Sequence, residues 1–268
     1  MLTLRTVQLF FSRLIALLVL VAPHVFAMSV DIEGADDSRL EENIETHIGI
    51  IGAPVGCELT PNYRQTIKEA VTKAAQAIGY YQLETLSIRV SKDQECSELY
   101  LSVRAGTRVK ISQRQIELVG AEKPDTVLQS VIDKAQLKEG TFLEQSQYES
   151  LKSKLLSTAQ VRGYFDAKFT TQEIRIDFDT YSASIHLVFA AGKRYAFGKL
   201  LIPEDDKAQV LIQEVSTFKE GEPYHADKLA EFNQNLKLTG YFQQVVARPL
   251  GSKAQGDEVP IELIASAK

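Results

Sequence analysis

Reactive side chains are scarce in this 268-residue sequence, and two cysteines with a nearby histidine are the first candidates for chemistry. Cys57 and Cys96 have a spacing that fits no zinc or redox motif. A cysteine nucleophile would need a base such as His47 to hold its thiolate. In an oxidising compartment the two cysteines can instead form a disulfide, which would stabilise the fold by roughly 3–4 kcal/mol because it closes a long loop. Two separate buried thiols are the alternative, and we favour the disulfide.

The other candidate residues form no catalytic pattern. His47, His186 and His225 are far apart in the sequence and lack metal-ligand spacing such as H-E-x-x-H. The sequence has no G-x-S-x-G nucleophile elbow and no P-loop. We therefore expect no enzyme, no metal site and no cofactor.

The composition indicates a globular protein without a nucleic-acid partner. Hydrophobic residues make up 44% of the chain and charged residues 24%, which is enough apolar material for a core. The 30 basic and 35 acidic residues are interspersed, and the lysines stand singly, as on a solvated surface. No basic patch of the kind that binds nucleic acid is present.

The N-terminus has the layout of a secretory signal peptide. Arg5 and Arg13 accompany an apolar run from Leu14 to Ala22, and short residues lead up to the expected cleavage between Ala27 and Met28. A retained membrane anchor is the alternative, but the run is shorter than the roughly 20 apolar residues that span a bilayer. Because this leader holds two arginines and no acid, the exported part would carry a net charge of −7. We expect that part to be soluble and periplasmic.

Three short sequence marks recur in the same order, which indicates an internal repeat. The first is a glycine followed by two aromatic residues, the second is Ala-Gly-x-Arg, and the third is Lys-Glu-Gly. They stand at Gly79-Tyr80-Tyr81, Gly163-Tyr164-Phe165 and Gly240-Tyr241-Phe242 for the first, at Gly106 with Arg108 and Gly192 with Arg194 for the second, and at Lys138-Glu139-Gly140 and Lys219-Glu220-Gly221 for the third. The first mark recurs at intervals of 84 and 77 residues.

Each repeat has the pattern of a strand, a short helix, a long helix and two strands. In the first repeat, Leu40 and Ile44 mark the short helix, and Thr60-Pro61 starts the long one as an N-cap followed by proline. Gly79 is expected to end that helix in the left-handed conformation that glycine adopts cheaply. Alternating apolar residues then predict two half-buried strands. The helices must cover one face of a small sheet, so we predict an α+β fold of three tandem βααββ two-layer modules.

The repeat positions set the expected boundaries. A signal peptide of residues 1–27 precedes domains at residues 28–106, 107–192 and 193–268. Ser38 and Ser146 each begin a capping-box spacing, and Asp125 can cap the short helix of the second repeat. The aromatic residues after each glycine are expected to cover the end of their own sheet as packing residues.

The marks resemble the POTRA domains of the outer-membrane β-barrel assembly superfamily. The resemblance covers essentially the whole exported part and is carried by residues 77–81, 106–109, 162–166, 192–198 and 238–242. Three such units after a signal peptide are most similar to the outer-membrane subunit of a translocation and assembly module. By this resemblance the family's C-terminal β-barrel would be missing, which would make the chain a fragment or a stand-alone periplasmic array.

The resemblance implies a periplasmic scaffold for outer-membrane protein assembly and autotransporter secretion. Its partners would be unfolded outer-membrane protein substrates and an inner-membrane-anchored, TamB-like protein, with membrane association only through a barrel. The POTRA region of a two-partner-secretion transporter or of another surface-antigen assembly protein is the alternative. Because a three-stranded sheet has free edges, an unfolded chain can add a strand to it. We expect docking on the strand after each glycine–aromatic mark, with docking on the helices as an equal alternative.

Overall fold

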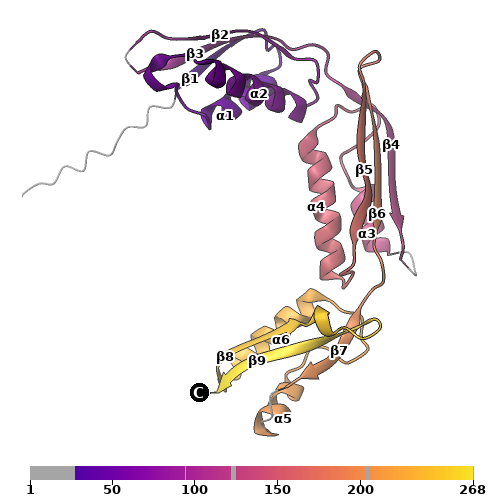
Figure 1. Ribbon diagram of the computed structural model, residues 1–268. Coiled ribbons are helices and arrows are strands. Elements are labelled where there is room, and N and C mark those ends of the chain that lie inside the picture. The colour runs from indigo at the N-terminus through magenta and orange to yellow at the C-terminus, as the bar shows by residue number, and fades with distance from the viewer. Residues whose placement is uncertain (1–27, 94, 122–124, 203–205, 268) are drawn as a thin grey trace, which may run out of the picture.

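The computed structural model describes residues 28–93, 95–121, 125–202 and 206–267 (Figure 1). The expected signal peptide lies outside the described residues.

Three units follow one another along the chain, each with three strands and two α-helices. The first contains β1 (Ser29–Glu33), α1 (Ser38–Gly49), a 3₁₀ turn (Val55–Cys57), α2 (Pro61–Ala77), β2 (Glu84–Val90) and β3 (Glu98–Arg104). The second contains β4 (Lys110–Val119), α3 (Thr126–Asp133), α4 (Gln145–Val161), β5 (Lys168–Asp177) and β6 (Ser182–Ala190). The third contains β7 (Ala196–Leu201), α5 (Asp206–Glu214), α6 (Ala226–Leu238), β8 (Phe242–Pro249), a 3₁₀ turn (Gly251–Lys253) and β9 (Glu258–Ala267).

All three sheets have the same topology. The strand orders are β1-β3-β2, β4-β6-β5 and β7-β9-β8, so the last strand of each unit lies in the centre. The first strand pairs with this central strand in parallel, and the middle strand pairs with it antiparallel. The predicted α+β fold of three tandem βααββ modules is confirmed, and we refer to the units as modules 1, 2 and 3.

Each module has a hydrophobic core of its own between its sheet and its helices. In module 2 every second residue of the central strand β6 is buried, from Ala183 to Phe189, as a half-covered sheet requires. Residues of α4 at helical spacing, such as Leu151 and Leu155, cover this face. Because every second strand residue and one stripe of each helix are apolar, the sheet and the helices pack against each other as two layers.

Two of the predicted helix starts are confirmed. Thr60 is the N-cap of α2, where its side chain accepts a hydrogen bond from the backbone N–H of Tyr63, and Pro61 is the first helical residue. Asp125 caps α3, and its carboxylate accepts from the backbone N–H groups of Val127 and Leu128. These caps satisfy backbone donors that a helix start leaves without a partner.

Two other starts were predicted wrongly. The N-cap of α1 is Asp37 rather than Ser38, and its carboxylate accepts from the backbone N–H of Arg39. Aspartate and serine cap helices equally well, so their adjacency left the choice to tertiary contacts. The helix α4 begins at Gln145, after Glu144, which makes no side-chain cap; Ser146 is therefore already inside the helix.

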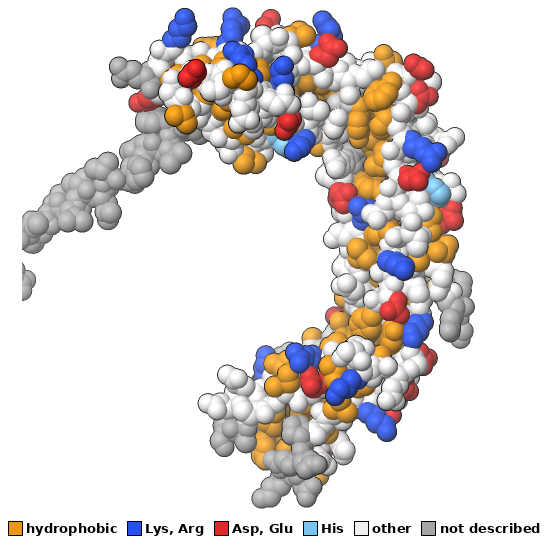
Figure 2. Space-filling model, viewed as in Figure 1, with side chains coloured by type: hydrophobic (Ala, Val, Ile, Leu, Met, Phe, Trp, Pro, Cys, Tyr) orange, Lys and Arg blue, Asp and Glu red, His pale blue; other side chains and the backbone are white. Residues whose placement is uncertain are grey.

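The modules lie along an open arc, with the long helices α2, α4 and α6 toward its inner side (Figure 1). The space-filling view has the same hollow outline (Figure 2). The connections are short, because only residues 105–109 separate β3 from β4 and residues 191–195 separate β6 from β7. None of the helices in the described part of the chain is both long and apolar enough to cross a membrane.

Candidate functional site

The sequence marks that recur in the chain meet at the junction between modules 1 and 2, which we call joint 1. The carbonyl oxygen of Gly79 accepts a hydrogen bond of 2.9 Å from the backbone N–H of Val109. Nε of Arg108 donates to the carbonyl oxygen of Ile78 over 2.6 Å. The carbonyl of Val109 in turn accepts a 3.0 Å bond from the N–H of Leu143, which follows the Lys-Glu-Gly mark. The end of α2, the linker and a loop of module 2 are thus bonded together.

The junction between modules 2 and 3, joint 2, repeats this arrangement. The carbonyl oxygen of Gly163 accepts a 2.9 Å hydrogen bond from the backbone N–H of Tyr195. Nε of Arg194 donates to the carbonyl oxygen of Arg162 over 3.0 Å. The N–H of Tyr224 donates to the carbonyl of Tyr195 over 3.0 Å. The three marks therefore specify one joint geometry that is used twice.

Both joints require glycine at the helix end. Gly79 and Gly163 have φ angles of +95° and +84°, in the left-handed region that glycine adopts without steric cost. A Cβ atom on Gly79 would lie 2.8 Å from the carbonyl oxygen of Leu143, and one on Gly163 would lie 2.8 Å from Cβ of Tyr224. Each glycine thus also makes room for the next module.

Joint 1 has a buried ionic centre around Arg108, whose side chain is 6% exposed. The guanidinium lies 2.9 Å from a carboxylate oxygen of Glu144 and 3.7 Å from one of Asp37. It also lies over the ring of Phe142, with 4.3 Å between the guanidinium carbon and the ring centroid. Glu144 and Phe142 belong to module 2 and Asp37 to module 1, so the arginine joins acidic and aromatic groups of both modules.

The electrostatics of this centre favour the ionised form of Asp37. Burial alone would raise the pKa of Asp37, but hydrogen bonds from the Arg39 backbone and the Tyr80 hydroxyl, with the charges of Arg39 and Arg108, lower it below its usual value. The Tyr80 hydroxyl donates to the Asp37 carboxylate over 3.1 Å. The carboxylate that caps α1 therefore also fixes the position of the Tyr80 side chain.

Joint 2 is built from aromatic rings instead. The ring of Phe165 lies 5.4 Å from that of Tyr195 and 4.9 Å from that of Tyr224, both in module 3. The hydroxyl of Tyr195 donates to the Asp166 carboxylate over 3.0 Å. Arg194 is half-buried, and no ion pair joins it to a carboxylate among the described residues. Phe165 was expected to cover its own sheet, whereas it contacts the following module; Tyr81 does the same at joint 1.

The first aromatic residue of each of these marks stays within its own module. The hydroxyl of Tyr164 donates to Asp125 over 2.9 Å, just as that of Tyr80 donates to Asp37. Asp125 also receives two hydrogen bonds from Arg162, at 2.8 and 2.9 Å, and its side chain is only 2% exposed. Burial would raise the pKa of Asp125, but the bonds from Arg162, from the backbone of α3 and from Tyr164 lower it. The sequence pattern identified the cap but not its tyrosine and arginine partners.

Two family models match the chain. Residues 29–105 match the model described as POTRA domain TamA domain 1, and residues 110–192 match the POTRA model described as surface antigen variable number repeat. Modules 1 and 2 are therefore POTRA domains, and module 3 repeats their topology. The described helices and strands of modules 1 and 2 fall within the two matched ranges.

Several solved structures are similar to this chain. POTRA domains 3–5 of Haemophilus influenzae BamA are 17% identical, with a TM-score of 0.46, and the match covers 88% of this chain and 94% of that one. POTRA domains 1–3 of Omp85 from Anabaena are 13% identical, with a TM-score of 0.35 and coverage of 90% and 95%. CdiB from Acinetobacter baumannii is 12% identical, with a TM-score of 0.36, and the match covers 60% of this chain and 30% of that one.

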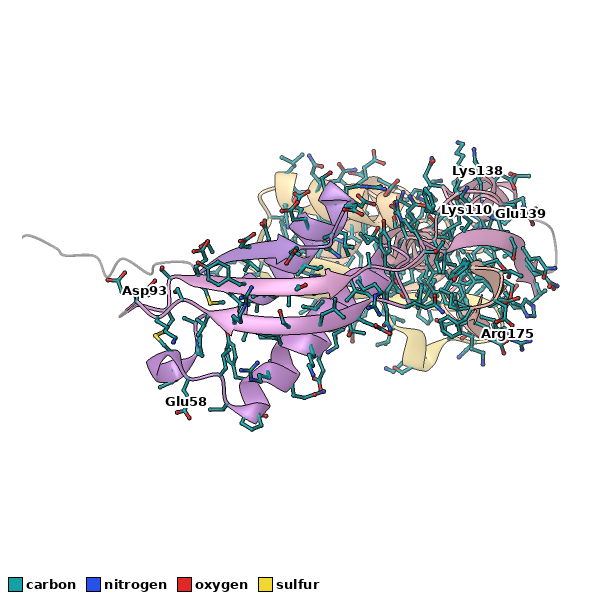
Figure 3. All side chains as sticks on the ribbon, turned by 90° about the horizontal axis from the view of Figure 1, so that it is seen from above. Glu58, Asp93, Lys110, Lys138, Glu139 and Arg175 are labelled. Atoms are coloured by element: carbon teal, nitrogen blue, oxygen red, sulfur yellow. A yellow bond between two sulfur atoms is a disulfide. The ribbon has the colours of Figure 1, made fainter. Side chains whose placement is uncertain are left out.

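The two cysteines lie away from the joints of this POTRA array. Cys57 and Cys96 form a disulfide with a Cα–Cα distance of 5.3 Å, which links the 3₁₀ turn before α2 to the loop between β2 and β3. In Figure 3, Glu58 and Asp93 beside this disulfide mark the far end of module 1, whereas Lys110 lies with module 2. Nδ1 of His47 lies 2.8 Å from the Asn43 carbonyl oxygen in its own helix. Within the described ranges, no three His, Cys, Asp or Glu side chains are grouped so that they could hold a metal ion.

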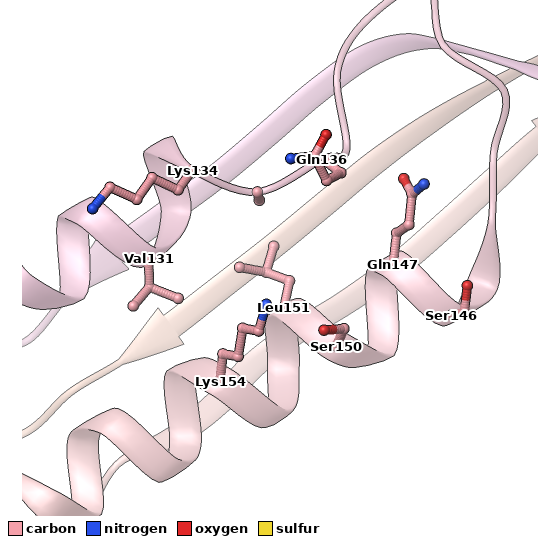
Figure 4. A pocket seen from close by; sticks show the side chains of 9 residues that line it. Val131, Lys134, Gln136, Ser146, Gln147, Ser150, Leu151 and Lys154 are labelled. Carbon is pink, nitrogen blue, oxygen red and sulfur yellow. The ribbon is translucent and has the colours of Figure 1, made fainter.

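Module 2 has a groove of about 480 Å³ between α3 and α4 (Figure 4). Val131 and Leu151 form its apolar floor, and Lys134 and Lys154 line it from opposite helices. Oε1 of Gln147 is buried there without a hydrogen-bond partner among the described residues. The groove thus combines apolar area, two cations and one buried acceptor.

Each POTRA sheet has two strands with only one neighbour. These edge strands are β1 and β2, β4 and β5, and β7 and β8. The outward edges of β4 and β7 are bonded at their starts to the loops around Gly140 and Gly221, through Ile111 and Phe197. Outward backbone N–H and C=O groups elsewhere along an edge strand can pair with another strand. Among the described residues, the free stretches of these sheet edges and the groove between α3 and α4 are thus the surfaces open to contact.

Proposed function

We propose that the chain is the periplasmic POTRA scaffold of a TamA-type factor for outer-membrane protein assembly and autotransporter secretion. The observation that carries this proposal is the match of module 1 to the model of the first TamA POTRA domain. Two further modules and the two hydrogen-bonded joints support it, because they hold several docking edges in a fixed order. In this proposal the protein binds polypeptides without catalysing a reaction and needs no cofactor.

The proposed location requires export. We place cleavage of the signal peptide between Ala27 and Met28, and domain boundaries at residues 106/107 and 192/193, inside the joints. The positions of joints 1 and 2 support these boundaries. N-terminal sequencing of the protein recovered from the periplasmic fraction should give Met28 as the first residue, and a retained leader would contradict the proposed export route.

The proposed docking mode is strand addition at the strand after each glycine–aromatic mark, namely β2, β5 or β8. Each carries a register shift near its start, at residues 85–87, 169–171 and 242–244. A bulge disrupts the backbone hydrogen bonds of a strand locally. Docking of a substrate strand is therefore confined to the part of β2, β5 or β8 beyond its bulge. Because pairing uses backbone groups, it binds substrates of many sequences.

The edge of β5 is the best candidate of the three. It extends from Lys168 to Asp177 and pairs regularly with β6 from Thr171 onward. Its 10 residues fall within the roughly 9–11 residues of one membrane-spanning β-strand. A substrate segment that later becomes a barrel strand can therefore pair along most of its length.

Proline scanning tests this edge. In an antiparallel strand, neighbouring residues direct their N–H groups alternately toward and away from the partner strand. Of the two variants Gln172→Pro and Glu173→Pro, the one that removes the outward N–H should keep its thermal stability and lose binding of an extended barrel-strand peptide. The matched controls are Gln115→Pro and Ile116→Pro on the opposite edge strand β4, again judged by the variant that stays folded. Unchanged peptide binding in the stable β5 variant would reject strand addition at β5 and favour docking on the helices.

The proposed partner is an inner-membrane-anchored, TamB-like protein. Co-purification of this partner with the protein from cross-linked cells supports the TamA-type assignment. The model matched by module 2 is described as surface antigen variable number repeat, so another surface-antigen assembly protein is the alternative. Cross-linking to substrate polypeptides without any TamB-like partner would favour this alternative, which includes the POTRA region of a two-partner-secretion transporter.

A further inference from the structure

The groove between α3 and α4 differs in charge from the chain around it. Its charged lining residues are Lys134 and Lys154, and the lining contains no aspartate or glutamate. The chain as a whole carries a formal net charge of −5. Both lysine side chains are exposed, and within the described ranges no carboxylate lies at ion-pair distance from either of them. The groove is thus a cationic surface on an acidic protein.

The carboxylates that lie closest to the groove along the chain already have other partners. Glu144 pairs with the buried arginine of joint 1, and Glu149 pairs with a lysine of its own helix that lies outside the groove. Asp133 accepts a hydrogen bond of 2.9 Å from a glutamine side chain of α3. These carboxylates therefore do not neutralise the two groove lysines, whose charges favour an anionic ligand.

The floor of the groove is apolar. Val131 of α3 and Leu151 of α4 point toward each other across it (Figure 4). The lining residues of α4 extend from Ser146 to Lys154, which corresponds to roughly 12 Å, or about two turns, along the helix. The groove therefore matches a short apolar ridge that has anionic groups at its margins.

The walls of the groove favour a helical ligand over an extended one. They are formed by α3 and α4, whose backbone N–H and C=O groups are bonded within each helix, apart from those of the terminal turns. An extended segment bound there would lose water from its own backbone groups without gaining partners, which costs free energy. An amphipathic helix satisfies its backbone internally and contacts the groove through side chains, ridge into groove.

We infer that this groove binds a short amphipathic helix of a partner polypeptide, with acidic residues on both sides of its apolar stripe. The stripe would cover Val131 and Leu151, and the carboxylates would pair with Lys134 and Lys154. This second mode of binding is separate from strand addition, and it rests on the proposed function only in that the partner is a polypeptide.

Other occupants match the groove less well. Membrane-binding patches use clusters of about four to eight basic residues, whereas this groove has two lysines beside an apolar floor. A second copy of this chain would have to offer an acidic amphipathic helix, and its α1 is of that type. The apolar stripe of α1 is fully buried in the core of module 1, so a folded second copy cannot present it.

A synthetic helical peptide is the probe for this groove. It has about 14 residues, with leucine at helical spacing, glutamate on both sides of that stripe and alanine elsewhere. Its control has glutamine in place of every glutamate. Fluorescence anisotropy with the purified protein at low salt should show saturable binding of the acidic peptide, and the control should bind about tenfold more weakly because two charge pairs are lost. No binding of the acidic peptide, or equal binding of the two, would overturn the inference.

A lysine variant of the protein identifies the site. Lys134→Gln combined with Lys154→Gln should weaken binding of the acidic peptide about tenfold, to the level of the glutamine control. The matched control is Lys68→Gln combined with Lys73→Gln, because these lysines are also exposed on a long helix, in module 1, and their removal changes the net charge equally. Equal binding by the two double variants would reject the groove as the site.

A pair of serine variants tests whether the position of the charge matters. Ser150 lines the groove, whereas Ser153 is exposed on the same helix outside the lining. Ser150→Glu places a carboxylate among the ligand's own carboxylates and should weaken binding several-fold more than Ser153→Glu. Because both serines are exposed, both variants should fold, which circular dichroism checks. An equal loss in the two would mean that only the overall charge of module 2 matters, which contradicts the inference.

Further measurements separate this inference from the proposed function and from the other occupants. The stable proline variant of β5 should bind the helical peptide normally; if it loses the peptide while the lysine variants keep it, the peptide binds a sheet edge and the inference is wrong. Failure of extended peptides to bind, with the helical peptide still held by the groove, would instead reject strand addition alone. Binding of phosphatidylglycerol vesicles that requires Lys134 and Lys154, without peptide binding, would identify a membrane as the occupant. Self-association in sedimentation that the double lysine variant abolishes would identify a second copy. Either result would contradict the inference.

Discussion

Joints 1 and 2 share one backbone geometry but are consolidated by different side chains. At joint 1 the buried Arg108 pairs with Asp37 and Glu144, whereas at joint 2 the rings of Phe165 and Tyr224 carry the contact. The hydrogen bonds from linker to helix end are the same in both. The backbone hydrogen bonds and the glycine therefore define the geometry of a joint. The surrounding side chains determine whether its stability depends on charge, as at joint 1, or on buried apolar area, as at joint 2.

The largest effect should come from removing the aromatic contact of joint 2. Tyr224 is 4% exposed and also lies 4.8 Å, centroid to centroid, from the ring of Phe197 in the core of module 3. Tyr224→Ala should lower the free energy of unfolding of module 3 by about 3–5 kcal/mol, because it leaves a cavity among aromatic rings. Hydrogen exchange of β7 and β9 measures it. Phe178→Ala, in a 51% exposed position, is the control, and an equal loss there would discount the role of joint 2.

Removal of the disulfide should have the next largest effect on stability. It should not change the stability of either joint. Replacing Cys57 and Cys96 by serine should cost module 1 about 3–4 kcal/mol, since the bond closes a long loop of the unfolded chain. Denaturant unfolding, followed by the exchange of β2 and β3, measures the loss, and reduction of the unmodified protein should reproduce it. If amide hydrogen exchange at residues 105–109 rose as much as that of β2 and β3, the disulfide end of module 1 would be coupled to joint 1. The stability of joint 1 would then not depend on its local contacts alone.

Arginine removal contrasts the two joints directly. Arg108→Ala should destabilise the contact between modules 1 and 2 by about 2–4 kcal/mol, because Glu144 and Asp37 lose their buried partner. Arg194→Ala removes one bond to a carbonyl and should cost about 1–2 kcal/mol. Small-angle scattering should show a wider spread of shapes for the Arg108→Ala variant. Equal effects of the two substitutions would mean that the ionic centre of joint 1 adds nothing to the shared backbone geometry.

The smallest expected effect is the acid sensitivity of joint 1. The pKa of Asp37 lies below its ordinary value of 3.8 in the folded protein. Its ionised form therefore contributes stability above that value, and the contribution is lost as the pH falls through the lowered pKa. Joint 1 should loosen below about pH 4, and Asp37→Asn should reduce this acid dependence. Exchange rates at residues 105–109, with residues 191–195 as the internal reference, measure it; identical acid profiles at the two joints would contradict the expectation.

Much of the fold follows from local patterns in the sequence. The stripes of apolar residues predicted the long helices, the alternation predicted the strands, and Thr60-Pro61 predicted where α2 starts. The left-handed glycines at residues 79, 163 and 240 were predicted because a single residue type adopts that backbone without strain. These features depend on residues within one or two helical turns of each other.

The joints could not be predicted in the same way, because their partners lie far apart in the chain. Arg108 is 36 residues from Glu144, and nothing in the local pattern pairs them. Phe165 was assigned to its own sheet because the repeat was considered one unit at a time, whereas its ring lies between two units. The recurrence of three marks in a fixed order was the available signal, since residues that recur at every junction are candidates for forming it. The prediction of Ser38 as the helix cap was wrong for a similar reason, since the actual cap, Asp37, also binds Tyr80 of a distant segment.

The parallel pairing of the first and last strand in each module has a consequence for reach. Since β4 and β6 run in the same direction, the chain enters module 2 at one end of the sheet and leaves at the other. An antiparallel pair would return the chain to its starting side and fold the modules back on themselves. Each repeat therefore adds nearly a full strand length, about 30 Å for the nine residues of β6, to the path of the array along its arc. The number of modules thus sets the contour length of the array.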